Sequence, residues 1–141
     1  MMAAAGCAAV LTSTVTGCGG GPSLRPPAGP VVKVDERDFQ IAVSPARVTG
    51  GLVDLQVDNE GPDMHELIVV RAEDAATLPM RPDGMTVNEA AVARVTVASL
   101  EPGEPGSVRN IEVKLLPGRY VLFCNMSGHF MGGMHTPLVV T

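Results

Sequence analysis

Short runs in which hydrophobic and polar residues alternate recur along the chain from residue 31 onward. The clearest example is residues 51–58, where Val53, Leu55 and Val57 alternate with acidic and amide side chains. Successive side chains of a strand point to opposite faces, so alternation predicts a strand with one buried and one solvated face. Alternation or a richness in β-branched residues predicts strands at 31–35, 38–43, 51–58 and 107–115.

Other stretches carry different patterns. Residues 65–71 are apolar on both faces, which predicts a strand near the middle of a sandwich. The irregular segment 72–94 contains Thr86-Val-Asn-Glu89, whose spacing is that of a capping box and predicts a short helix near 87–94. Residues 101–106 hold two Pro-Gly pairs and predict a turn. Together these elements predict an all-β, two-sheet sandwich with one short helix in a middle insertion.

The amino-terminal segment differs from the rest of the chain. Residues 1–24 carry no charged side chain, and residues 3–15 are mildly apolar and rich in alanine, as in the apolar region of a signal peptide. Val15-Thr-Gly-Cys18 resembles a bacterial lipobox, which implies a signal peptide at 1–17 and a lipidated Cys18. Residues 18–30 are rich in glycine and proline and predict a tether to the membrane. The alternative is a disordered Ala/Gly-rich tail.

Length and composition limit the function. About 110 residues follow the tether, which suits one domain at 31–141. The net charge of −5, without any cluster of Lys or Arg, disfavours nucleic-acid binding. The absence of Trp and the presence of only one Tyr and three Phe also leave few rings on which bases could stack.

Ligand chemistry gathers near the carboxyl terminus. Cys124, His129 and Met134 lie on one predicted hairpin loop between two strands. Soft sulfur donors beside an imidazole favour copper, and an electron-transfer copper site uses two His, one Cys and a weak axial Met. A second His is therefore expected from elsewhere, and His65, at the start of a predicted strand, is the one His outside the loop region.

Each of these residues also has a simpler interpretation. Taken alone, Cys124 is a small buried apolar residue, His65 a core histidine, His129 a surface residue and Met134 a core side chain. Their combination makes copper ligation the preferred hypothesis. Rival ligands in the same loop are His135, expected to point outward, and Met126 and Met131.

Cysteine usage supports the same hypothesis. Cys7 would leave with the signal peptide and Cys18 would carry lipid, so Cys124 would be the only thiol of the mature protein. A lone thiol in an exported protein cannot form a disulfide within its chain, and metal ligation explains its presence.

The spacing Cys124-x4-His129-x4-Met134, with the upstream Asn59-x-Gly and His65-Glu-Leu-Ile-Val, resembles that of the cupredoxins, the small type 1 blue copper proteins. The resemblance covers roughly residues 31–141. It implies a Greek-key sandwich and one copper ion held by His65, Cys124, His129 and Met134. It also implies Met134, rather than Met126 or Met131, as the axial ligand.

The resemblance implies electron transfer outside the cytoplasm, with copper cycling between Cu(I) and Cu(II). His129, ringed by Phe130, Met131 and Met64, is the expected electron port at which a redox protein docks transiently. Many blue copper proteins have an Asn after the strand His that ties the two ligand segments together. Here that residue is Glu66, and Asn125 is the candidate for a replacement hydrogen bond.

Other functions are weighed against this one. Multicopper enzymes need further His-bound coppers, and three His cannot supply them, so no enzymatic activity is expected. The many Met residues near the loop keep open a lipid-anchored carrier or scavenger of Cu(I). A metal-free adhesion or scaffold domain is a third class. The chain is expected to be a monomer that meets the membrane only through its lipid.

Overall fold

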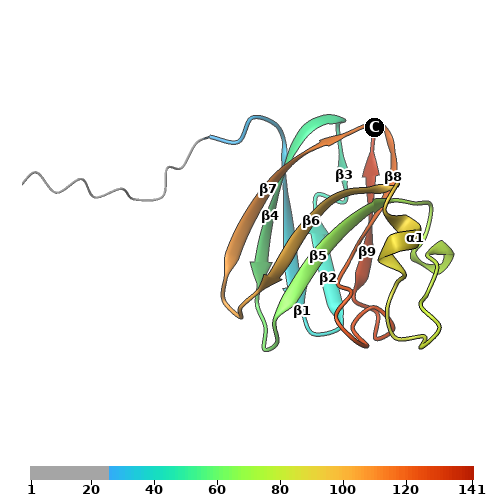
Figure 1. Ribbon diagram of the computed structural model, residues 1–141. Helices are drawn as coiled ribbons and strands as arrows, with labels where there is room; N and C mark the ends of the chain where they lie inside the picture. Colours follow the sequence, from blue (N-terminus) through green and yellow to red (C-terminus); the bar gives the residue numbers. More distant parts are fainter. Residues whose placement is uncertain (1–25) are drawn as a thin grey trace, which may run out of the picture.

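The computed structural model describes residues 26–141, which form two β-sheets facing each other (Figure 1). One sheet has the strand order β2-β1-β4-β7 and the other has the order β3-β9-β8-β5-β6. The strands of the first sheet are β1 (Val31–Arg37), β2 (Gln40–Ser44), β4 (Gly51–Asn59) and β7 (Val108–Leu115). Those of the second are β3 (Arg47–Val48), β5 (His65–Arg71), β6 (Thr96–Gly103), β8 (Gly118–Phe123) and β9 (His135–Val140).

Both sheets are mixed. β1 runs parallel to β4, and β3 runs parallel to β9, whereas the other neighbouring strands pair antiparallel. This arrangement confirms the predicted all-β, two-sheet Greek-key sandwich.

Alternation places the main hydrophobic core between the sheets. Val53, Leu55 and Val57 of β4 are fully buried there, as the sequence pattern predicts. They pack in one cluster with side chains of the opposite sheet, such as Leu67 and Leu122. The loop between β8 and β9 is therefore carried by two sheets that are packed firmly against each other.

A second core explains why β5 is apolar on both faces. Leu67 and Val69 face the main core, whereas Ile68 and Val70 belong to a separate buried cluster. The segment between β5 and β6 covers this outer face of the sheet and contributes Val87 and other side chains to the cluster. The segment contains the 3₁₀ helix η1 (Ala75–Thr77) and the helix α1 (Glu89–Val92).

The helix begins later than the capping box predicts. Its N-cap is Asn88, whose side chain accepts a hydrogen bond from the Ala91 N–H. Thr86 cannot serve as the cap because the next residue, Val87, is extended and buried and forms a β-bridge with Met80. Burial of Val87 in the second core thus overrides the local capping signal.

The turn predicted at 101–106 is only partly correct. Glu101–Gly103 are the last residues of β6, a strand that the sequence pattern missed, and the turn begins at Glu104. β6 is an edge strand whose residues are mostly exposed or half-buried, and its pairing with β5 contains two irregularities. A strand edge tolerates Pro102, which lacks an N–H.

The predicted signal peptide at 1–17 and the lipidated Cys18 lie outside the described residues, as does most of the predicted tether. At its end, the Pro30 carbonyl accepts a hydrogen bond from the Asp54 N–H at 3.0 Å. Within residues 26–141, no helix is both long and apolar enough to cross a membrane.

Candidate metal centre

The loop between β8 and β9 is folded tightly on itself. The Cys124 N–H donates to the Met134 carbonyl at 3.1 Å, and the Met134 N–H donates to the His129 carbonyl at 3.0 Å. Gly128 and Gly133 have φ of 83° and 102°, in the left-handed region that glycine adopts most readily. These bonds bring the two ends of the loop together, so that Cys124 and Met134, ten positions apart, lie side by side.

His65 is the first residue of β5, which runs antiparallel to β8, so it lies at the same end of the sheet as the β8–β9 loop and directly follows a well-fixed turn. The fully buried Asn59 side chain donates to the carbonyls of Asp63 at 2.9 Å and Gly103 at 2.8 Å. Its amide oxygen accepts from the Gly61 N–H at 2.8 Å. Asn59 of the Asn-x-Gly motif therefore shapes the turn that delivers His65.

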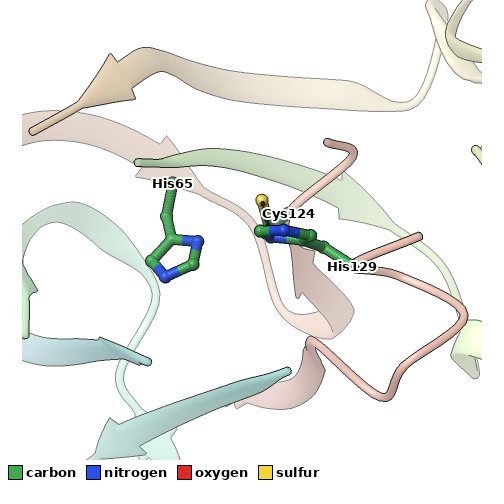
Figure 2. Close-up of side chains that lie close together, drawn as sticks. All are labelled: His65, Cys124 and His129. Atoms are coloured by element: carbon green, nitrogen blue, oxygen red, sulfur yellow. Dashed lines mark hydrogen bonds between the residues drawn. The ribbon is translucent and has the colours of Figure 1, made fainter. Parts of the chain in front are cut away.

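Three of the four predicted ligands come together. One ligand atom from each of His65, Cys124 and His129 lies within 4.8 Å of the others (Figure 2). The Cys124 Sγ and the His129 Nδ1 are 3.6 Å apart, and the two imidazole centres are 5.2 Å apart. His65 and Cys124 are fully buried, and His129 is 9% exposed.

Met134 and the rival ligands occupy different environments. Met134 is fully buried in the main core cluster, to which Cys124 also belongs. Met126 is half-buried against that cluster, and Met131 is 60% exposed. His135 is half-buried with its ring against Phe130, at 5.1 Å between centres, and is not part of the ligand cluster.

Burial weakens the charged forms of two of these residues. Burial raises the pKa of the Cys124 thiol to about 11, although the backbone N–H groups of Met126 and Glu66 favour the thiolate. Burial, and then the neighbouring His129, lower the pKa of His65, whereas Asp38 opposes that change. A bound cation reverses this balance for the thiol, because metal coordination deprotonates it.

The donor set fits a soft metal ion. Both ring nitrogens of His65 are buried without a hydrogen-bond partner, and Figure 2 shows one of them turned toward Cys124 and the other turned away. A buried polar atom without a partner costs free energy unless a ligand satisfies it. One thiolate and two imidazoles, with a thioether nearby, form the donor set that suits copper.

The Asn125 side chain ties the ligand loop to the insertion between β5 and β6. The Glu66 backbone N–H lowers the pKa of the Cys124 thiol, and the Asn125 backbone N–H lowers the pKa of Glu66, in each case against the larger effect of burial. Burial, and next the charge of Glu89, raise the pKa of Glu66. The Asn125 side chain bonds to both backbone groups of Val87, at 2.6 and 3.1 Å, and to the Glu89 carboxylate at 2.7 Å.

The surroundings of His129 differ from the expected rim. Phe130 is 7% exposed and packs in the second core against Phe123, at 5.5 Å between ring centres, so it is not a rim residue. Met64 and Met131 are exposed at 37% and 60%, as a rim requires. Phe39, 52% exposed, has its ring 5.4 Å from that of His129 and was not predicted.

Comparison with known structures supports the fold. An auracyanin from the photosynthetic bacterium Roseiflexus castenholzii matches with a TM-score of 0.60 and 20% identity, over 81% of this chain and 98% of that chain. Auracyanin A, a "blue" copper protein from Chloroflexus aurantiacus, matches with a TM-score of 0.59 and 18% identity, over 80% and 100%. Rusticyanin from Thiobacillus ferrooxidans matches with a TM-score of 0.57 and 16% identity, over 81% and 79%.

The chain therefore has a cupredoxin-like fold. The sequence itself matches no protein-family model and no curated protein. At 16–20% identity the structural likeness establishes the architecture alone, so the chemistry of the site has to be argued from its own residues.

Proposed function

We propose that this protein is a type 1 copper electron-transfer protein that binds one copper ion through His65, Cys124, His129 and Met134. The observation that carries the proposal is the buried convergence of one thiol and two imidazoles at the end of a rigid sandwich. The likeness in fold to auracyanin, a "blue" copper protein, supports it. Copper bound there would supply one-electron chemistry by alternating between Cu(I) and Cu(II).

The chain's own residues would keep the ligands fixed while the charge changes. Two backbone N–H groups, from Met126 and Glu66, lower the pKa of the Cys124 thiol and so favour its negative charge. The backbone bonds that close the loop hold His129 and Met134 in place. Burial of the cluster excludes water, so few groups have to reorganise when an electron arrives.

His129 is the proposed electron port because it is the one clustered ligand with measurable exposure. Phe39, Met64 and Met131 supply exposed apolar side chains near the loop and turn that carry the ligands. A redox protein would dock there through a small, transient interface, with the protein acting as a monomer. No substrate-converting activity is proposed.

The proposed location is outside the cytoplasm. The lipobox-like Val15-Thr-Gly-Cys18 supports lipidation of Cys18 and attachment to the outer face of the cell membrane or within the periplasm. The glycine- and proline-rich residues 18–30 would then act as a tether for the copper domain at 31–141.

A Cu(I) carrier is the second candidate. Three exposed thioethers favour it, because Met64, Met85 and Met131 are 37–60% exposed and soft sulfur binds Cu(I). The two functions differ in how firmly copper is held. An electron-transfer protein retains copper through both oxidation states, whereas a carrier releases Cu(I) to a competing ligand.

The test is the visible spectrum of the purified protein after one equivalent of Cu(II) is added. We expect an intense sulfur-to-copper charge-transfer band, since a thiolate and two imidazoles would hold the ion. Cys124→Ser should abolish the band and leave the folded sandwich, as judged by circular dichroism. His135→Ala is the matched control and should retain the band, because His135 lies outside the cluster. The ligand assignment is wrong if Cys124→Ser keeps the same band.

A further inference from the structure

The turn between β1 and β2 contacts both clustered histidines. Pairing of Arg37 with Gln40 closes a two-residue turn formed by Asp38 and Phe39. The Asp38 Oδ1 lies 3.1 Å from the His65 Nε2, and the Phe39 ring lies beside that of His129. The turn therefore bridges the two ligands, one from β5 and one from the β8–β9 loop.

Phe39 adopts an unusual backbone conformation to make its contact. Its φ is 62°, a region that a bulky residue rarely occupies. Its ring covers Gly132, where an added Cβ would lie 2.2 Å from the Phe39 Cδ1. This packing holds the turn against the ligand loop and fixes the position of the preceding Asp38.

The turn is also fastened to the segment that delivers His65. The Asp38 Oδ1 accepts a hydrogen bond from the Asp63 N–H at 3.2 Å. Arg37 pairs with Glu60, and the Glu60 N–H donates to the Glu36 carbonyl at 2.9 Å. These contacts fix Asp38 independently of its contact with His65.

Asp38 lies beside one ring nitrogen of His65, the Nε2. Neither ring nitrogen of His65 has a hydrogen-bond partner in this structure, but the Nε2 lies 3.1 Å from the Asp38 Oδ1 and is the nitrogen placed to donate to it, and such bonds can tighten when a ligand binds. A hydrogen bond from Nε2 to Asp38 would leave Nδ1 for a metal ion. A carboxylate that holds the distal nitrogen of a metal-bound His fixes its tautomer and makes it a stronger donor.

We propose that Asp38 is a positioning residue that holds the His65 Nε2–H, presents Nδ1 to the metal and, through its negative charge, favours Cu(II) over Cu(I). The inference rests on the proposed copper function. The Asp38 side chain is 26% exposed, whereas that of His65 is fully buried. Water therefore reaches the carboxylate only in part, and its charge acts on His65 through the protein interior.

Two substitutions separate the hydrogen bond from the charge. Asp38→Asn removes the charge but keeps an oxygen that can accept from both His65 and the Asp63 N–H. Asp38→Ala removes both. Asp63→Asn is the matched control. The Asp63 carboxylate also raises the pKa of His65 through its negative charge, and the bond from Asp63 to Asp38 comes from its backbone N–H, which the substitution keeps.

The first readout is the reduction potential of the copper-loaded full chain. Asp38→Asn should raise the Cu(I)/Cu(II) ratio at a fixed solution potential about tenfold, which is about 59 mV for one electron, and Asp38→Ala should raise it further. Asp63→Asn should cause a smaller change. Equal shifts for Asp38→Asn and Asp63→Asn, or no shift for either Asp38 variant, would overturn the proposal.

The second readout needs no copper. Nitrogen-15 NMR of the metal-free protein should show the Nε2–H tautomer of His65 in the wild type and in Asp38→Asn, and a mixture in Asp38→Ala. Identical tautomers in all three would also overturn the proposal. If Asp38→Ala fails to fold, Asp38→Asn and its potential still decide the question. If the wild type develops no blue colour, the copper function fails while the tautomer still tests Asp38.

Discussion

Glu36 is a buried acid whose ionisation should make the stability of the protein depend on pH. It lies on the inward face of β1 and is fully buried, with one oxygen 2.6 Å from the Arg109 guanidinium and the other without a partner. Burial raises the pKa of Glu36 from 4.5 to about 7, because the loss of water outweighs the attraction of Arg109. The charge of Glu66 on β5 raises it slightly further.

The sign of the effect follows from proton binding. Between pH 4.5 and 7 the folded protein keeps a proton on Glu36 that the unfolded chain has lost. The contribution of Glu36 to the free energy of unfolding therefore falls as pH rises through this window and is constant above it. At about 1.4 kcal/mol per pKa unit, the full change is about 3 kcal/mol.

The perturbation is Glu36→Gln, and the assay is urea unfolding of the metal-free protein at pH 4.5, 6 and 8. The wild type should lose about 3 kcal/mol more stability than Glu36→Gln between pH 4.5 and 8, because Gln cannot titrate. Glu112→Gln, which removes an exposed carboxylate from β7, should match the wild type at each pH. Parallel pH profiles for the wild type and Glu36→Gln would refute the reasoning.

Two further substitutions test the supports of the site. Asn125→Ala should cost about 1–3 kcal/mol and speed amide exchange over residues 80–95, because it removes the partners of the buried Val87 backbone; unchanged exchange there would contradict the assigned link. Met134→Gln should keep copper and lower the reduction potential, because the axial ligand tunes it. An unchanged potential in Met134→Gln would exclude the thioether as a ligand.

Much of the fold could be predicted from the sequence because its signals are local. The alternation in β4 and the doubly apolar β5 identify strands directly, and both are observed. The spacing of Cys124 and His129 places both residues on one loop, and His65 begins β5 as predicted. Short-range patterns of this kind are enough to gather three candidate ligands.

The remaining features depend on contacts between distant segments. β6 is an edge strand whose inward residues Ala98 and Leu100 are only half-buried against the main core, and its pairing with β5 is irregular, so its local pattern is weak. The sequence predicts Phe130 in an apolar rim around His129, yet Phe130 fills the second core formed with the insertion. Asp38 lies 27 positions from His65 and Phe39 lies 90 positions from His129, and no spacing rule connects them.

The most direct test of the central claim is a reversible redox titration of the copper-loaded protein in the presence of a Cu(I) chelator. Electron transfer predicts that the visible band bleaches on reduction and returns fully on reoxidation, with one electron and one copper per chain. Loss of copper to the chelator on reduction, with no return of the band, would contradict the claim and favour the carrier.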